Sequence, residues 1–412
     1  MFSPKRILIV ALNYAPELVG CAKYTTELAE DLACRGHKVE VVCAPPYYPH
    51  WRVLAGYSGA RWTSEHINGV RVNRAPLYVP PRPTGLKRII HLASFGLSAG
   101  PAAVFAARRL RPDVVFTVAP TLASSMTALL SAQITGAKKW LHIQDFEVDA
   151  AFELGLLGSA RSRAFALKAE KALLNSFDIV STISPAMAAL LGSKGVPTNR
   201  VVEFRNWVDV DAISMHPESA TNLRAELQIG PDKVVALYSG NMAAKQGIEM
   251  LAEVARGAAA SNPKLVFLFC GDGPAKGELE HRSSGLGNVR FLPLQPLERL
   301  SELLATADIH LLPQRPEAAD LVLPSKLTGM LASGRPVVAM APNGSGLAQE
   351  VEGCGIVVQP TAPAMAEAVF ALSNNPTLRK ELGTQGRRRA EERWRKSAII
   401  DGFERHLSEL QS

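Results

Sequence analysis

The sequence predicts an α/β protein with two doubly wound parallel sheets, one in each half of the chain. This prediction rests on the length of 412 residues, on a hydrophobic fraction of 47%, and on short β-branched segments that alternate with helical patterns. A chain of this length usually divides into two or more domains, each with its own core. Alternating strands and helices are typical of βαβ units, in which the strands pair in parallel.

The first half of the chain is expected to form one Rossmann-like domain over residues 1–205. Its helical patterns are well delimited, because Gly36 follows the pattern at 24–35 and Gly136 follows the one at 122–135. The predicted strands are 6–12, 38–43, 113–118, 138–143, 178–181 and 201–204.

A looser pattern at residues 206–232 indicates a linker, after which the alternation of strands and helices resumes. We expect a second Rossmann-like domain at 233–386, with a long amphipathic helix at 387–412 that crosses back to the first domain. Ligands of open parallel sheets bind beyond the carboxyl ends of the strands, so two such domains facing each other would form a cleft. The predicted strands of the second domain are 233–238, 265–269, 289–291, 309–312, 337–340 and 356–358.

Charge and cysteine content argue against several classes of protein. The excess of 45 Lys and Arg over 38 Asp and Glu favours anionic partners, but the basic residues are scattered and aromatic residues are few, which argues against nucleic acid. The five cysteines are widely spaced and form no CxxC pair, so neither a disulfide framework nor a zinc site is indicated. The apolar segment 7–12 is too short for a signal peptide. We therefore expect a cytoplasmic protein with reduced thiols.

A second apolar segment, residues 92–107, has basic residues on both sides. A membrane-spanning helix needs about 20 apolar residues, so this segment is too short to span a bilayer. Its basic flanks suit a helix that lies on an anionic membrane surface over residues 86–111. A buried crossover helix with solvated ends fits the pattern equally well, and both interpretations stay open.

The strongest local motif is a glycine-containing loop between a predicted strand and a helix. Gly240 and Asn241 end the strand, and Lys245 and Gln246 open the helix. Free backbone N–H groups and the positive end of a helix favour a phosphate at such a loop, and Lys245 adds a full charge. The alternative explanation is a solvated lysine at the start of a helix.

A tight turn follows the next predicted strand at the same edge of the second sheet. In this turn, Gly271 and Gly273 flank Asp272 and would let the backbone approach a ligand closely, although such turns are often structural. Gln295, after the following strand, is assigned to the same ligand site.

Residues 320–327 lead from a loop into a helix. Leu323 and Pro324 precede the helix, and Ser325 and Lys326 fall in its first turn, where phosphate or ribose oxygens would bind. Asp320 is a candidate acceptor of hydrogen bonds from a sugar. A helix cap and a surface charge are the structural alternative.

The first domain contributes a second group of candidates. Gly20 is predicted at a junction between a loop and a helix, and Tyr14 lies in the same loop. Asp145 follows the strand at 138–143, where a carboxylate can orient or activate a hydroxyl group. His142 is a further candidate, although its position in the strand also fits a buried core histidine.

Several of these motifs together resemble glycosyltransferase family 4, and the resemblance covers almost the whole chain. Within that family, six stretches are similar to the colanic-acid fucosyltransferase-like branch, which assembles exopolysaccharide repeats on a lipid carrier. These stretches are NYAPELVG, APPYYPHW, PLYVPPRPTGLKRIIHLASF, HIQDFEVDA, SGNMAAKQG and VLPSKLT.

The resemblance implies a GT-B fold and a retaining glycosyltransferase that needs neither a metal nor another cofactor. The donor would be a nucleotide diphosphate sugar, GDP-fucose by analogy with the branch or a UDP-linked sugar. A lipid-linked saccharide would be the acceptor, bound by Tyr14 and His142 at the inner face of the cytoplasmic membrane. Lys245 takes the place of the family's phosphate-binding lysine, and Asp145 would act on the acceptor hydroxyl. The donor-binding candidates are Gly20, Gly240, Asn241, Gln246, Gly271, Asp272, Gly273, Gln295, Asp320, Leu323, Pro324, Ser325 and Lys326.

The chain departs from the family pattern at three positions. Asn241 replaces an arginine, and the family's paired glutamates fall on Leu321 and Gly329. We hypothesise that Lys326 supplies the missing charge and that Asp320 replaces one carboxylate.

Other functions fit parts of the pattern. A nicotinamide dehydrogenase lacks support, because no GxGxxG follows the first strand. A nucleotide-sugar epimerase on the same fold and a non-catalytic nucleotide-binding scaffold at the membrane remain alternatives. The DxD of Asp209 and Asp211 would suit a divalent metal, but it lies in the predicted linker.

Overall fold

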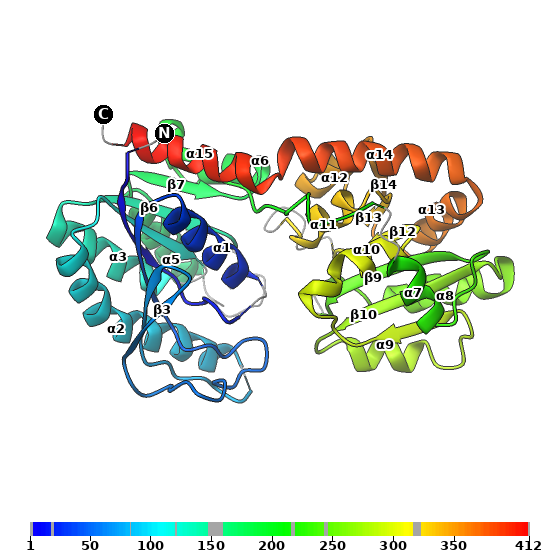
Figure 1. Ribbon diagram of the computed structural model, residues 1–412, viewed down its shortest axis with the longest axis horizontal. Helices are drawn as coiled ribbons and strands as arrows, with labels where there is room; N and C mark the ends of the chain where they lie inside the picture. The colour runs from blue at the N-terminus through cyan, green and yellow to red at the C-terminus, as the bar shows by residue number, and fades with distance from the viewer. Residues whose placement is uncertain are drawn as a thin grey trace. The chain divides into compact units, whose positions relative to one another are not determined.

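The computed structural model describes residues 3–17, 20–82, 84–119, 122–146, 160–215, 219–242, 246–315 and 323–410. The chain forms two compact units (Figure 1). The N-terminal unit comprises Met1–Arg205 together with Ile400–Ser412, and the C-terminal unit comprises Asn206–Ile399.

Among the described residues, the N-terminal unit contains an eight-stranded sheet with the order β3-β4-β2-β1-β5-β6-β7-β8. Apart from β3 with β4, neighbouring strands pair in parallel. The order reverses between β1 and β5, as in a doubly wound sheet. The strands are β1 Arg6–Val10, β2 Lys38–Cys43, β3 Thr63–Ile67, β4 Val70–Arg74, β5 Val114–Ala119, β6 Lys138–Ile143, β7 Ile179–Thr182 and β8 Val201–Glu203.

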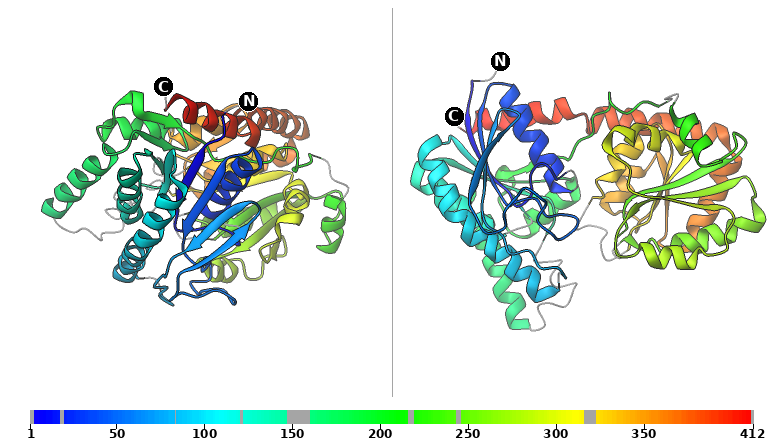
Figure 2. Two further views of the ribbon diagram at one scale, coloured as in Figure 1. Left: turned by 60° about the vertical axis from the view of Figure 1, so that its left-hand side comes forward. Right: turned by 60° about the horizontal axis from the view of Figure 1, so that its bottom comes forward.

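Helices cover both faces of this sheet (Figure 2). Successive residues of a strand face opposite sides, and in β1 both sides are buried. Leu8 and Val10 pack with Phe95 of α2 in one core cluster. The helices of the unit are α1 Cys21–Cys34, α2 Gly85–Leu110, α3 Leu122–Thr135, α5 Ala160–Leu174, α6 Pro185–Ser193 and, at the end of the chain, most of α15 Lys396–Glu409.

The β3–β4 hairpin is absent from the sequence prediction, which expected parallel strands alone. Asn68 and Gly69 connect its two strands, and both have positive φ, 46° and 83°. Asn-Gly is the preferred pair for a two-residue hairpin turn. The signal was therefore present in the sequence, but β3, at the sheet edge, is almost entirely polar and shows no strand pattern.

The C-terminal unit contains a six-stranded parallel sheet within its described residues, with the order β11-β10-β9-β12-β13-β14. This order reverses between β9 and β12, so the prediction of two doubly wound sheets is confirmed. The strands are β9 Val234–Asn241, β10 Leu265–Asp272, β11 Val289–Leu292, β12 Ile309–Leu312, β13 Val337–Met340 and β14 Gly355–Val358. The helices are α7 Ser219–Glu226, α8 Met250–Ser261, α9 Lys276–Arg282, α10 Leu300–Thr306, α11 Lys326–Ala332, α12 Gly346–Val351, α13 Ala362–Asn374 and α14 Pro376–Arg393.

Two predicted boundaries need correction. The supposed linker 206–232 contains α7 and belongs to the C-terminal unit, where Leu223 joins a core cluster with residues of β9 and β10. Residues 387–412 are not one helix, because α14 ends at Arg393 and α15 begins at Lys396. At the break, the carbonyl of the buried Trp394 accepts a hydrogen bond from the backbone N–H of Val208 at 2.9 Å. The helix does return to the N-terminal unit as expected, from Ile400 onward.

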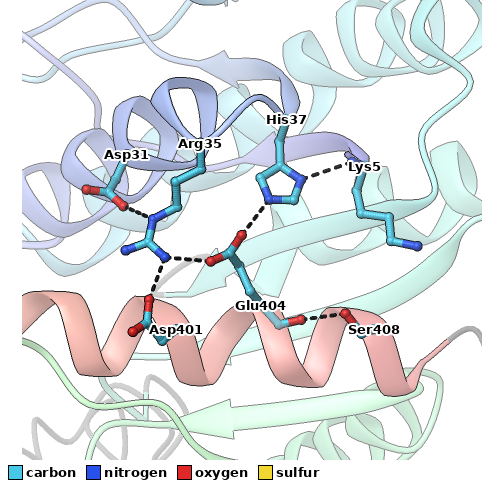
Figure 3. A network of polar contacts seen from close by, with 7 residues as sticks. All are labelled: Lys5, Asp31, Arg35, His37, Asp401, Glu404 and Ser408. Atoms are coloured by element: carbon cyan, nitrogen blue, oxygen red, sulfur yellow. Dashed lines mark hydrogen bonds and ion pairs between the residues drawn. The ribbon is translucent and has the colours of Figure 1, made fainter. Parts of the chain in front are cut away.

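A buried carboxylate attaches α15 to the N-terminal unit (Figure 3). Glu404 accepts hydrogen bonds from Arg35 at 2.5 Å and from His37 Nε2 at 2.9 Å. The other ring nitrogen of His37 accepts the backbone N–H of Lys5 at 3.0 Å, which assigns the proton to Nε2. Arg35 also donates to the exposed Asp401. The end of α1 and the starts of β1 and β2 are thus joined to the last helix.

We expect Glu404→Ala to lower the free energy of unfolding by about 2 to 3 kcal/mol, because it leaves His37 and Arg35 without their shared buried acceptor. Asp401→Ala is the matched control and should cost less than about 1 kcal/mol, since that carboxylate is exposed. Urea denaturation followed by tryptophan fluorescence measures both, because the ring of Trp140 stacks on Phe403 of α15 at 4.6 Å. Equal losses in the two variants would show that Glu404 does not hold the helix.

Candidate functional site

The carboxyl ends of β9 and β10 lie side by side in the C-terminal sheet, and β9 borders the point where the strand order reverses. Gly271 pairs with Gly240 in the strand register, and a Cβ atom on Gly271 would lie 2.0 Å from the carbonyl oxygen of Gly240. On Gly273, a Cβ atom would lie 2.6 Å from the oxygen of Met242. Both glycines have φ near +150°. They are therefore required by the close packing of the two loops, whereas the sequence suggested only the approach of a ligand.

Lys326 at the start of α11 reaches back to the end of β9. Its Nζ donates to the hydroxyl of Tyr238 at 2.9 Å and lies 4.1 Å from the centre of that ring. It also lies 3.4 Å from Oε1 of Gln246, and a Cβ atom on Gly240 would be 3.5 Å away. The geometry thus brings together three predicted donor-binding residues, Gly240, Gln246 and Lys326, around a tyrosine that the sequence analysis missed.

Burial lowers the pKa of Lys326 to about 7, from an ordinary value near 10.5. The described surroundings of its Nζ are a hydroxyl, an amide oxygen and an aromatic face, with no carboxylate bonded to it. Such a lysine is partly neutral near pH 7, and a neighbouring anion would favour its charged form. A phosphate ligand beside Lys326 would therefore shift this lysine toward its protonated form.

The remaining donor-site candidates that the structure describes in the C-terminal unit lie at or near the same edge of the sheet. Asp272 is exposed, and its Oδ1 accepts the backbone N–H of Gly273 at 2.8 Å. Gln295 follows β11 and donates to the oxygen of Pro293 at 3.0 Å. Ser325 is exposed and forms no cap bond at the start of α11, contrary to the cap interpretation. The other described candidates are Asn241, the last residue of β9, and Leu323 and Pro324, which precede α11.

Two predicted residues, Lys245 and Asp320, lie outside the described residues, and so does Leu321. The second glutamate position of the family pattern falls on Gly329, inside α11. A Cβ atom there would lie 3.4 Å from a methyl group of Leu304 and 4.0 Å from one of Ile213. An apolar environment would leave a carboxylate without partners, so the absence of a glutamate at position 329 is consistent with the apolar side chains around it.

Among the N-terminal candidates, His142 is a neutral core histidine. Its Nδ1 lies 2.9 Å from Ser181 Oγ, and its Nε2 lies 2.9 Å from Gln144 Nε2. Burial lowers its pKa to about 3, and only 3% of the residue is exposed. The structure therefore favours the core interpretation over direct contact with an acceptor.

Tyr14, Gly20 and Asp145 lie in loops that follow β1 and β6. Tyr14 is buried, which raises the pKa of its hydroxyl, and this hydroxyl has no hydrogen-bond partner among the described residues. Gly20 precedes the first residue of α1 with φ +61° and ψ −139°, a conformation that favours glycine. Asp145 is partly exposed just beyond the carboxyl end of β6, as predicted.

Glu17 is a buried carboxylate that the sequence analysis did not single out. Its Oε1 accepts the backbone N–H groups of Tyr47 and Tyr48 at 2.5 and 2.7 Å, and Asn13 donates to Oε2 at 2.8 Å. Burial raises the pKa of this carboxyl group. His91 of α2 extends the network, because its Nε2 lies 3.0 Å from the hydroxyl of Tyr47. The network joins the NYAPELVG and APPYYPHW stretches, whose contact with each other the sequence analysis did not predict.

The DxD aspartates have structural partners. Asp209 Oδ1 accepts the backbone N–H groups of Asp211 and Ala212, both at 3.1 Å. Asp211 forms an ion pair with Arg395 at 2.8 Å. Within the described parts of the chain, no group of three or more His, Cys, Asp or Glu residues could hold a metal ion.

Comparisons with known proteins identify the family. Residues 19–207 match the family described as Glycosyl transferase 4-like domain, and residues 233–375 match Glycosyl transferases group 1. An Escherichia coli (strain K12) protein that carries the name colanic acid biosynthesis glycosyl transferase WcaI is 39% identical over 407 residues, which are 97% of this chain and 98% of that protein. The chain belongs to glycosyltransferase family 4. The predicted family and the prediction of a hexosyltransferase-type enzyme are confirmed.

Solved structures show that this glycosyltransferase has the GT-B fold. Sucrose-phosphate synthase from Thermosynechococcus elongatus has a TM-score of 0.77 at 19% identity, with 98% of this chain and 99% of that chain covered. Anabaena Alr3699/HepE in complex with UDP-glucose has a TM-score of 0.71 at 16% identity, with coverage of 98% and 99%. At these identities the similarity concerns the fold alone.

We expect Gly271→Ala to destabilise the C-terminal unit by more than about 2 kcal/mol, because the new methyl group would overlap the backbone of Gly240. Gly277→Ala in α9 is the matched control, since nothing lies within 4 Å of its added Cβ atom. The control should leave stability unchanged or raise it by up to about 1 kcal/mol, as alanine favours helix. Thermal or urea denaturation measures both, and a harmless Gly271→Ala would contradict the close packing of the two loops.

Proposed function

We propose that this glycosyltransferase transfers a sugar from a nucleotide diphosphate donor to a lipid-linked saccharide during exopolysaccharide synthesis of the colanic-acid type. The observation that carries the proposal is the end-to-end similarity to the Escherichia coli relative named for colanic acid biosynthesis. Transfer proceeds with retention of the anomeric configuration and without a metal, at the inner face of the cytoplasmic membrane. GDP-fucose is the proposed donor, and UDP-linked sugars are the alternative.

The loops at the ends of β9 and β10 support a donor site in the C-terminal unit. Gly240, Gln246 and Lys326 lie together where the strand order reverses, the usual position of a nucleotide in an open α/β sheet. Lys326 and Lys245 would stabilise the negative charge that develops as the nucleoside diphosphate departs. Fixed cationic groups of this kind typically lower a barrier by several kcal/mol.

Asp145 is the proposed partner of the acceptor hydroxyl. Asp145 follows β6 at the carboxyl edge of the N-terminal sheet, and the residue is partly exposed although its Oδ1 atom is buried. It orients the hydroxyl for attack, and the departing phosphate takes the proton. His142 supports this position from the core, because it bonds to Gln144 directly before Asp145.

We expect binding of the donor to weaken as pH rises above about 7. A diphosphate beside Lys326 favours its protonated form, so binding takes up a proton above the pKa of about 7 in the unliganded protein. The affinity should therefore fall by up to about tenfold per pH unit. Lys326→Met should remove this part of the pH dependence, and Lys326→Arg should keep the charge throughout. Calorimetric titration with GDP-fucose and UDP-glucose between about pH 6 and 9 measures the slope. The same slope in wild type and Lys326→Met would remove Lys326 from the site.

The activity itself is tested with a panel of GDP, UDP and dTDP sugars. A thermal-shift screen identifies the donor, because a ligand that binds only the folded state raises its apparent stability. Transfer to a lipid-linked saccharide is then measured for wild type and Lys245→Ala, whose turnover should fall by roughly two orders of magnitude. The exposed Lys264→Ala is the control and should retain wild-type turnover.

Three outcomes would contradict the proposal. A donor sugar that changes without an acceptor would indicate an epimerase. Nucleotide binding without transfer to any lipid-linked acceptor would indicate a scaffold. Loss of activity in EDTA that Mn²⁺ restores would show that the reaction needs a metal.

A further inference from the structure

The outward sides of α2 and α3 carry large apolar side chains that are exposed. On each helix they recur at helical intervals, which places them along one side. On α2, Leu86, Ile90, Leu97 and Phe105 form this stripe, with Leu97 81% exposed and Phe105 66% exposed, and Ile89 beside it is also exposed. On α3, Met126, Leu130 and Ile134 form the stripe. We call the seven residues of the two stripes the α2–α3 face.

The opposite side of α2 is packed in the core of the N-terminal unit. Phe95, Ala99, Ala103 and Ala106 are fully buried there. Thr127 of α3 donates to the carbonyl of Gly96 at 2.9 Å, and α2 and α3 lie side by side (Figure 1). The α2–α3 face is therefore separate from the side of α2 that is buried in the core of the unit.

α2 matches the helix expected over residues 86–111. By length and composition alone, this 26-residue helix could cross a membrane, although the apolar segment 92–107 is only part of it. Only 28% of its most apolar window is buried inside the unit. Its inward side nevertheless packs on the sheet, which suits a helix lying along a surface.

Basic residues stand at both ends of the exposed apolar stripe of α2. Lys87 and Arg88 lie in its first turn and Arg108 in its last, and all three are exposed. The sequences of α2 and α3 contain no Asp or Glu. Two copies of the face packed together would bring these like charges close in either orientation of the helices, which is unfavourable. An anionic lipid surface complements both the apolar stripe and the charges.

An exposed tryptophan borders the same helix. Trp62 is 57% exposed, and its Nε1 donates to the carbonyl of Ser98 on α2 at 3.0 Å. Tryptophan is favoured where one part of the ring meets an apolar phase and another remains near polar groups. Its position therefore fits the boundary between lipid headgroups and chains.

We propose that the α2–α3 face docks the N-terminal unit onto an anionic lipid bilayer. The axis of α2 lies along the surface, with Leu97 and Phe105 inserted and Lys87 and Arg108 among the headgroups. This inference deepens the proposed function and rests on it, because docking on lipid would bring the enzyme to a surface at which a lipid-linked acceptor is presented.

Co-sedimentation of the full chain with vesicles tests this docking. We expect binding to vesicles of phosphatidylglycerol and phosphatidylethanolamine, and little binding to phosphatidylcholine alone. Leu97→Asp/Phe105→Asp and Lys87→Glu/Arg108→Glu should each lower the partition coefficient by roughly tenfold or more, because each basic residue near an anionic surface contributes about fivefold. High salt should weaken the binding of wild type.

Matched controls are available in the C-terminal unit. Phe370→Asp replaces another exposed phenylalanine, and Lys380→Glu reverses another exposed lysine. Both should bind vesicles as wild type does. Thermal midpoints verify that each variant is folded, and the charge-reversal variant tests the face even where the apolar variant fails to fold.

The proposal is overturned by wild-type protein that remains in the supernatant with anionic vesicles, or by folded variants that all sediment alike. A wild-type dimer that Leu97→Asp dissociates, without vesicle binding, would assign the face to a second copy of the chain. Co-sedimentation uses no donor or acceptor, so its result does not depend on the transfer assay. Vesicle binding by a protein that transfers no sugar in that assay would reject the proposed function and leave the docking surface intact.

Discussion

The close approach of β9 and β10 at their carboxyl ends is the constraint on which the candidate donor site depends. The carbonyl oxygen of Gly240 occupies the space that a side chain at position 271 would need. Backbone hydrogen bonds continue the contact, because the N–H of Met242 donates to Asp272 and that of Ala275 donates to Met242. These contacts fix the end of β9 and with it Tyr238, the residue to which Lys326 bonds.

Several departures from the family pattern are related to one another through Lys326. Asn241 removes a cation, and Gly329 removes a carboxylate that would have faced Leu304. The lysine lies against an aromatic ring and an amide instead of a carboxylate. Its charge is consequently not neutralised within the described surroundings, and it remains responsive to an incoming anion.

The sequence predicted the fold closely because buried parallel strands are continuous apolar segments. Residues 38–43, 138–143 and 309–312 were located with the bounds that the structure has. The β3–β4 hairpin was missed because the edge strand β3 is almost entirely polar. The break at Trp394 was missed because helical periodicity continues on both sides of it. In the candidate site, glycine and charge patterns indicated loops that the structure brings together, those that hold Gly240, Gln246 and Lys326. They could not reveal Tyr238 or Glu17, whose roles depend on residues far away in the sequence.

The hydrogen bond between His91 and Tyr47 gives α2 a second role. Leu97 follows His91 by six positions, and a rise of 1.5 Å per residue places them about 9 Å apart along the helix axis. The helix that would rest on lipid therefore also supports the tyrosine-containing loop held by Glu17. Contact with lipid and support of the loop would then fall to one helix, so a displacement of α2 on the bilayer would be transmitted to Tyr47.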